Sequence, residues 1–151
     1  MKNAVILGST GYTGAEAVRL ISGHPKINIV ALVGNTNVGI PYESLYPNFQ
    51  GLKLPIIKSI NDIDWSNVDV IFSCLPHGAS QDVISKVYNL VDTIIDLSAD
   101  FRLKDPNLYQ DTYGEKHLVP EYLPDHQLQI PEARYVKFSD LQESPLPVQH
   151  Q

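Results

Sequence analysis

The start of the chain places the strongest constraint on the fold. An apolar run from Ala4 to Leu7 leads directly into Gly8-Ser9-Thr10-Gly11-Tyr12-Thr13-Gly14, so a short buried strand ends in three evenly spaced glycines. The first glycine can adopt backbone angles closed to residues with a Cβ, the second lets the main chain approach a diphosphate, and the third allows a following helix to pack against the strand. The pattern predicts a phosphate-binding turn between a strand and a helix.

The residues after the glycines support this interpretation. A helix is expected near Thr13 to Ser22, because four apolar residues recur at helical spacing, namely Ala17, Val18, Leu20 and Ile21. The spacing G-x-x-G-x-x-G differs from the more common G-x-G-x-x-G, and 9 glycines in 151 residues produce chance patterns. A tight strand-to-helix turn that binds no ligand is therefore the alternative at this stage.

Apolar runs alternate with helical patterns along most of the chain. Strands are expected near residues 3–7, 27–33, 68–73 and 93–97, with a second helical stripe formed by Val83, Ile84, Val87 and Tyr88. This alternation predicts an α/β fold, a Rossmann-like doubly wound parallel sheet. Ligands of such sheets bind at the carboxyl ends of the strands, so the loops after Leu7, Val33, Phe72 and Leu97 are the ones to examine.

The end of the second expected strand bears on the choice of cofactor. Dinucleotide sites that prefer NAD usually place an acidic residue there to bind the ribose 2′-hydroxyl. Here the segment reads Gly34-Asn35-Thr36-Asn37 and holds no carboxylate, so a 2′-phosphate would not be repelled and NADP is favoured. No Arg or Lys stands beside this segment in the sequence to bind that phosphate.

Composition excludes several other classes of protein. The net charge is −6 and the 11 basic residues are scattered, which argues against a nucleic-acid partner. The single cysteine, Cys74, excludes a disulfide framework, and the histidines form no ligand pair on a helix face, so no metal site is expected. No signal peptide or membrane span is recognised, and a cytoplasmic location is the default expectation.

Leu75-Pro76-His77-Gly78 follows the third expected strand, where a loop would face a cofactor. His77 could position a ligand or act as a general acid or base, since an imidazole titrates near neutral pH. Alternatively, Pro76 and Gly78 shape a turn in which His77 only satisfies backbone groups.

A second polar segment, Asp96-Leu97-Ser98-Ala99-Asp100-Phe101-Arg102-Leu103, ends the fourth expected strand. Ser98 offers a hydroxyl, and Arg102 offers a planar fork suited to a phosphate or a carboxylate. Asp100 and Arg102 could instead pair with each other or with Asp105. Cys74 lies near His77 in the sequence, but a lone cysteine beside a leucine is more often a small buried hydrophobe than a nucleophile.

Taken together, these motifs resemble the N-acetyl-γ-glutamyl-phosphate reductase family over about residues 1–125. The segments that carry the resemblance, in matching order and spacing, are Gly8 to Glu16, His24-Pro25, Leu75 to Gly78, Ser98 to Pro106, Tyr113-Gly114 and Pro120-Glu121. The family is an NADP-dependent reductase of arginine biosynthesis, related in fold and chemistry to aspartate-semialdehyde dehydrogenase. Its enzymes convert an acyl phosphate into a semialdehyde through a cysteine thioester, with a histidine of a second domain assisting.

The resemblance implies roles for residues of this chain. Gly8, Ser9, Thr10, Gly11, Tyr12, Thr13 and Gly14 would hold the cofactor diphosphate. Leu75, Pro76 and His77 would lie along the cofactor. Ser98 and Arg102 would lie near its reacting end, with Arg102 as the candidate for the substrate's phosphate.

The chain also departs from the family pattern. The family's nucleophile lies in an Asn-Pro-Gly-Cys-Tyr segment, which residues 133–151 do not supply, and Cys74 is not its counterpart. We therefore expect an NADP-binding domain over residues 1–126 and an irregular divergent tail over residues 127–151. We expect the family's catalytic and dimerisation domain to be absent. We also expect no reductase turnover from this chain alone. Two alternatives are the related carrier-linked aminoadipyl-phosphate reductase of lysine biosynthesis and a non-catalytic NADP-binding module.

Overall fold

The structure is a computed structural model, and it describes residues 1–123. The boundary expected at 126 and the tail expected over 127–151 lie outside the described residues. The strands are β1 (Lys2–Leu7), β2 (Ile27–Val33), β3 (Ile57–Lys58), β4 (Val70–Ser73) and β5 (Thr93–Asp96), and the α-helices are α1 (Tyr12–Ser22), α2 (Tyr42–Leu45), α3 (Ala79–Val87) and α4 (Pro106–Tyr113). Short 3-10 turns occupy Pro47–Phe49, Ile60–Asp62, Trp65–Asn67 and Pro120–Tyr122.

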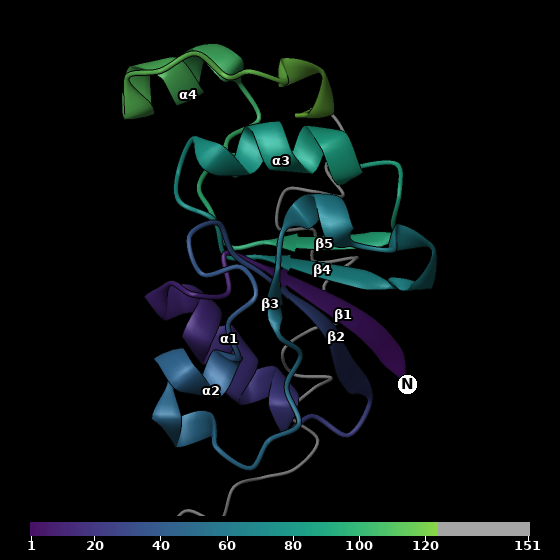
Figure 1. Cartoon of the computed structure of the whole chain (residues 1–151). Coiled ribbons are helices and arrows are strands. Elements are labelled where there is room, and N and C mark those ends of the chain that lie inside the picture. The colour runs from purple at the N-terminus through teal and green to yellow at the C-terminus, as the bar shows by residue number, and fades with distance from the viewer. Residues whose placement is uncertain (124–151) are drawn as a thin grey trace, which may run out of the picture.

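The strands form one parallel sheet in the order β3-β2-β1-β4-β5. Figure 1 shows α1 and α2 on one face of this sheet and α3 on the other, with α4 lying outside α3. The chain thus winds outward from β1 in both directions, which confirms the doubly wound α/β prediction. Because all strands are parallel, the loops that follow β1, β2, β4 and β5 leave the same edge of the sheet.

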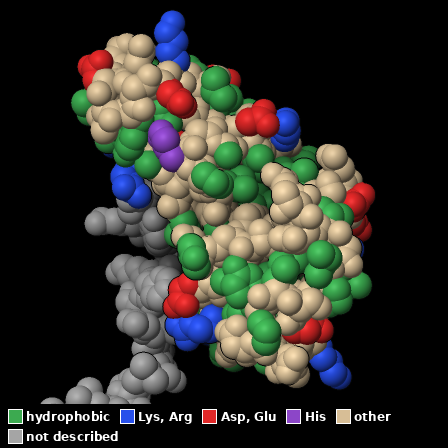
Figure 2. All heavy atoms as spheres, turned by 60° about the vertical axis from the view of Figure 1, so that its left-hand side comes forward, with side chains coloured by type: hydrophobic (Ala, Val, Ile, Leu, Met, Phe, Trp, Pro, Cys, Tyr) green, Lys and Arg blue, Asp and Glu red, His purple; other side chains and the backbone are tan. Residues whose placement is uncertain are grey.

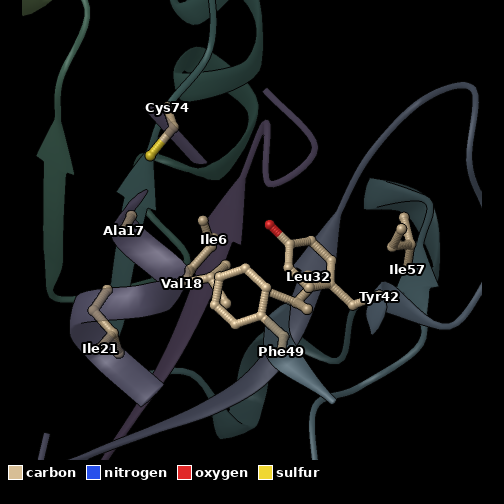
Figure 3. Packing of buried hydrophobic residues seen from close by; sticks show 9 residues of the cluster. All are labelled: Ile6, Ala17, Val18, Ile21, Leu32, Tyr42, Phe49, Ile57 and Cys74. Carbon is tan, nitrogen blue, oxygen red and sulfur yellow. The ribbon is translucent and has the colours of Figure 1, made fainter. Parts of the chain in front are cut away.

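The central strand β1 shows why the sheet is buried on both faces. Ile6 packs into a cluster with α1 and α2 residues, whereas its neighbours Val5 and Leu7 pack into the cluster on the α3 face. This alternation follows the two-residue period of a strand. Figure 3 shows the first cluster, whose members are Ile6, Ala17, Val18, Ile21, Leu32, Tyr42, Phe49, Ile57 and Cys74.

Three elements were not expected from the sequence. The Gly/Pro/Asn-rich stretch over 34–55 contains the short helix α2, and the two-residue strand β3 follows it. Helix α4 lies where sequence regularity declines, although Asp105 accepts a hydrogen bond from the Asn107 N–H and Pro106 occupies the first turn. These are the ordinary start signals of a helix.

Three findings on the described residues bear on possible partners and ligands. On the face shown in Figure 2, Lys and Arg side chains are spread among acidic ones and form no stripe. Of the helices within residues 1–123, none is long and apolar enough to cross a membrane. No cluster of three metal-ligating side chains occurs among these residues.

Candidate functional site

Three of the loops singled out from the sequence meet at the carboxyl edge of the sheet. The loop after β1 touches the loop after β4 at Gly8, where a Cβ would lie 2.7 Å from the Cys74 carbonyl oxygen. The loop after β4 touches the loop after β5, because the Gly78 N–H donates to the Asp100 carboxylate at 3.0 Å. The fold therefore brings the glycine motif, the His77 loop and the Ser98 segment together.

The three motif glycines differ in what the protein requires of them. Gly8 has φ +67°, a conformation that residues with a Cβ rarely adopt, and a Cβ on Gly14 would overlap the Gly8 carbonyl oxygen. Gly11 has φ −80°, and its nearest neighbour would be the Gly8 oxygen at 3.7 Å. Folding thus accounts for Gly8 and Gly14, whereas nothing in the described residues requires glycine at position 11.

The first turn of α1 presents unpaired donors beside Gly11. Gly11 is the N-cap residue, no side chain caps the helix, and no residue of the first turn is acidic. The backbone N–H groups of such a turn and the positive end of the helix dipole form a ready site for an anion. Tyr12 and Thr13 begin this turn with exposed side chains.

Hydrogen bonds from the α2 region hold the glycine loop in place. The Tyr42 hydroxyl donates to the Ser9 carbonyl at 2.7 Å, and the Tyr46 hydroxyl donates to the Thr10 carbonyl at 2.6 Å. The buried Ser9 hydroxyl and the Ser9 N–H both donate to the Val33 carbonyl. Ser9 therefore shapes the loop, and its own donors are already used within the protein.

The N-terminus of α3 is closed by a carboxylate from the chain itself. Asp100 is fully buried, and its oxygens accept from the N–H groups of Gly78 and Gln81 and from the Tyr109 hydroxyl. The carboxylate thus replaces a side-chain cap on α3. The sequence suggested instead that Arg102 pairs with Asp100 or with Asp105, and the described residues form neither pair.

His77 is the fourth partner of Asp100. Its Nδ1 lies 2.8 Å from Asp100 Oδ1, and its ring lies 4.6 Å from the Tyr113 ring between centroids. The imidazole is about one-third exposed at 37%, so its outer edge faces solvent at the site. His77 therefore satisfies a buried side chain, not the backbone of its own turn, and keeps one nitrogen available for a ligand.

Further hydrogen bonds hold the side chain and the backbone around Asp100 in place. Gln81 donates to the Tyr109 hydroxyl at 2.8 Å and accepts from the Leu118 N–H. The buried His117 places its Nε2 2.7 Å from the Asp100 carbonyl oxygen. His117 thus has a structural role in holding the segment after β5, and it does not lie free for a substrate.

Ser98 lies beside another carboxylate, that of the partly buried Asp96 at the end of β5. Its hydroxyl donates to Asp96 Oδ2 at 2.7 Å and accepts from the Asp100 N–H, while Ser80 donates to Asp96 Oδ1. Burial raises the pKa of the Asp96 carboxyl, and the hydrogen bonds from Ser98 and Ser80 partly oppose that rise. Ser98 is therefore held in one orientation at the site edge.

The remaining two candidates lie in contrasting environments. Arg102 is exposed, and it forms no ion pair with any of residues 1–123. Cys74 is buried at one end of the cluster in Figure 3, and burial raises the pKa of its thiol to about 12. Cys74 is thus a small core residue, as its sequence context indicated. Because a neutral buried thiol is a poor nucleophile, it is not a candidate for covalent catalysis.

Comparison with known proteins identifies the family of this chain. Residues 3–139 match the family model described as semialdehyde dehydrogenase, NAD binding domain. N-acetyl-γ-glutamyl-phosphate reductases are 48% identical over 121 residues in Cereibacter sphaeroides and 45% identical over 123 residues in Rhodospirillum rubrum, covering 80% and 79% of this chain. These alignments cover 35% of each relative, so the chain spans about a third of their length.

Solved structures show the same fold at low sequence identity. Aspartate semialdehyde dehydrogenase with NADP from Candida albicans has a TM-score of 0.52 at 23% identity, covering 70% of this chain and 32% of that one. Aspartate semialdehyde dehydrogenase II from Vibrio cholerae, complexed with ASA, has a TM-score of 0.53 at 18% identity, covering 68% and 29%. The resemblance inferred from the motifs is confirmed, and the chain belongs to the semialdehyde dehydrogenase NAD-binding domain family, a family of oxidoreductases.

Proposed function

We propose that this chain binds NADP, with its diphosphate on the glycine loop and the first turn of α1. The observation that carries the proposal is Gly11, which the described protein does not require to be glycine and which lies at an uncapped helix N-terminus. A position kept free of a Cβ beside unpaired N–H groups suits close approach of a diphosphate.

The residues around the glycine loop fit the rest of a dinucleotide. Leu75 borders the loop, because a Cβ on Gly8 would lie 3.2 Å from its backbone nitrogen. Pro76 and His77 follow Leu75 directly, and the three residues would lie along the cofactor. Ser98 would lie near its reacting end, held by its hydrogen bond to Asp96. When bound, the nicotinamide ring supplies a hydride to a carbonyl carbon.

The choice of NADP over NAD rests on the end of β2. Gly34 to Asn37 carry no carboxylate, so the usual acceptor for an unphosphorylated ribose 2′-hydroxyl is missing from this segment. The absence of negative charge there also removes a repulsion against a 2′-phosphate. An affinity for NADPH well above that for NADH is the expected result.

We further propose that the chain is the cofactor-binding portion of an N-acetyl-γ-glutamyl-phosphate reductase and that it does not catalyse the reduction alone. The relatives named above support N-acetyl-γ-glutamyl phosphate as the substrate, over the carrier-linked aminoadipyl phosphate of lysine biosynthesis. No Asn-Pro-Gly-Cys-Tyr segment occurs in the 151 residues, and Cys74 is buried with a pKa of about 12. The exposed Arg102 is our candidate for the substrate's phosphate in a complete enzyme.

Calorimetric titration with NADPH tests the binding proposal. Gly11→Ala adds a Cβ at φ −80°, which alanine accepts, so the fold should persist while affinity falls by about tenfold or more. Gly23→Ala is the matched control at the other end of α1, because nothing lies within 4 Å of a Cβ there. Unchanged NADPH affinity in Gly11→Ala, or no binding by the unaltered chain, would reject the proposal.

An assay in the oxidative direction tests the second proposal. The purified chain is incubated with NADP, phosphate and N-acetylglutamate semialdehyde, and NADPH absorbance is followed. No turnover is expected, since the thioester has no accessible thiolate on which to form. NADPH formation above a heat-denatured control would show that the chain is active alone.

A further inference from the structure

The short strand β3 places the cationic side chain of Lys58 beside the end of β2. The sequence alone does not reveal this neighbour. Val33, the last residue of β2, pairs with Lys58, and the Gly34 N–H donates to the Lys58 carbonyl at 3.1 Å. Lys58 is 24 positions beyond Gly34 in the sequence, which is why the segment appeared to lack a neighbouring basic residue. In space it lies at the carboxyl end of the adjacent strand.

The surroundings of Lys58 leave its ammonium free for a ligand. Its neighbour Ile57 is buried in the α1-side cluster, so alternation directs Lys58 to the opposite face, the one Val33 shares with α3. Lys58 is exposed, and none of the described residues forms an ion pair with it. Asn35 and Thr36 beside it are also exposed and uncharged.

The end of β2 also touches the loop proposed to hold the diphosphate. A Cβ on Gly34 would lie 3.2 Å from the Thr10 methyl group and 3.0 Å from Ile57. The glycine loop, the β2 end and the β3 end are therefore consecutive contacts along one edge of the sheet. A single nucleotide whose phosphates lie on the glycine loop can place its ribose over Gly34.

We propose that Lys58 binds the 2′-phosphate of the adenosine ribose and thereby determines the preference for NADP. The inference rests on the proposed dinucleotide function and adds the residue that makes the discrimination. An ammonium on a flexible stem is a suitable point charge for a phosphate dianion, and Asn35 and Thr36 offer further hydrogen-bond donors. An unphosphorylated ribose gains nothing from this cation.

Lys58→Gln removes the charge and keeps a polar side chain, and NADPH and NADH are each titrated by calorimetry. NADPH affinity should fall about tenfold with NADH affinity unchanged, and Lys58→Arg should retain the preference. Lys26→Gln is the matched control, because Lys26 precedes the opposite end of β2, where its carbonyl accepts from the Lys2 N–H. It should leave both affinities unchanged.

Adenosine 2′,5′-bisphosphate and 5′-AMP serve as probes that omit the nicotinamide half. Lys58→Gln should weaken the first about tenfold and leave the second unaffected. Equal changes for NADPH and NADH, or no change for either, would overturn the assignment of Lys58 while the dinucleotide function stands. Failure of the unaltered chain to bind any of the four nucleotides would overturn both.

Discussion

The loops after β1 and β4 each connect a central strand to a helix at the same edge of the sheet, yet they treat the helix N-terminus in opposite ways. The N-cap of α1 is Gly11, and no side chain of the described residues caps this helix, whereas at Gly78, the N-cap of α3, the buried Asp100 carboxylate does so. The N-terminus of a helix favours negative charge in both cases. At α3 the chain supplies that charge, and at α1 we propose that the cofactor supplies it.

This difference separates a structural junction from a binding junction. Asp100 is fully buried and accepts from Gly78, Gln81, Tyr109 and His77, so the α3 junction is complete within the protein. The backbone of the α1 junction is held by the hydroxyls of Tyr42 and Tyr46, but no side chain of the described residues pairs with the donors of its helix N-terminus. A site that is preorganised and unsatisfied is what an anionic ligand requires, because little reorganisation opposes binding.

The largest effect on stability is expected from a substitution that forces apart the close backbone contact between Gly14 and Gly8 at the α1 junction. Gly14→Ala would drive a Cβ into the Gly8 carbonyl oxygen and the Ser9 backbone, where neither atom belongs to a flexible side chain. We expect a loss of about 3 kcal/mol of unfolding free energy, measured by urea denaturation. Gly23→Ala should stay within about 0.5 kcal/mol, and an equal loss in both variants would contradict this account.

The next largest effect is expected at the α3 junction. Asp100→Asn leaves one acceptor oxygen for the buried donors that now share two, and it removes the negative charge beside the His77 ring. We expect a loss of about 2 kcal/mol in urea denaturation, since buried donors are left unsatisfied. Asp82→Asn, an exposed acid in the first turn of α3, is the control and should cost less than about 0.5 kcal/mol.

The two junctions also show how far sequence reasoning reaches. The α1 junction was predictable because its constraints are local: evenly spaced glycines follow a buried strand and precede a helical stripe. The α3 junction was not, because Asp100 lies 22 positions from Gly78 and its nearest charged neighbours in sequence suggested a surface pair. The order of motifs placed Asp100 in a family pattern without indicating which groups it contacts.

The same limit explains the missed elements. Strand β3 has two residues, too few for a periodic pattern, and its pairing with β2 is a long-range contact that brings Lys58 to Val33. Helix α4 carries one buried residue, Tyr109, so it lacks an apolar stripe. Its start signals at Asp105 and Pro106 were present and would have supported a helix.

A smaller effect is expected at Cys74, where the two loops touch. Its thiol pKa rises from an ordinary 9 to about 12, so the folded state disfavours ionisation and its stability should fall as pH rises from 9 to 12. Relative to Cys74→Ala, the unaltered chain should lose about 1 kcal/mol between pH 8 and pH 10 in urea denaturation. A pH-independent difference between the two chains would contradict a buried neutral thiol.

Iodoacetamide labelling gives an independent check on Cys74. At pH 8 the native chain should react far more slowly than the chain in urea, because labelling of a buried thiol waits for local opening. Free cysteine measured alongside sets the rate of an accessible thiol. Native labelling at that rate would show that the contact between Gly8 and Cys74 is open in solution.

The smallest change in stability, and the most direct test of the comparison, comes from giving α1 the kind of cap that α3 has. Gly11 has φ −80° and ψ 173°, the extended geometry of an N-cap residue, so Gly11→Asp can place a carboxylate over the unpaired N–H groups. We expect the chain without ligand to gain a few tenths of a kcal/mol in urea denaturation. NADPH binding should be lost, because the new carboxylate occupies the position of the diphosphate and repels it.

Gly23→Asp is the control, because it puts the same charge at the other end of α1, where the helix dipole opposes it. This variant should bind NADPH normally with slightly reduced stability. If Gly11→Asp binds NADPH as well as Gly23→Asp does, the free N-terminus of α1 is not the anion site, and the two junctions differ only in how they fold.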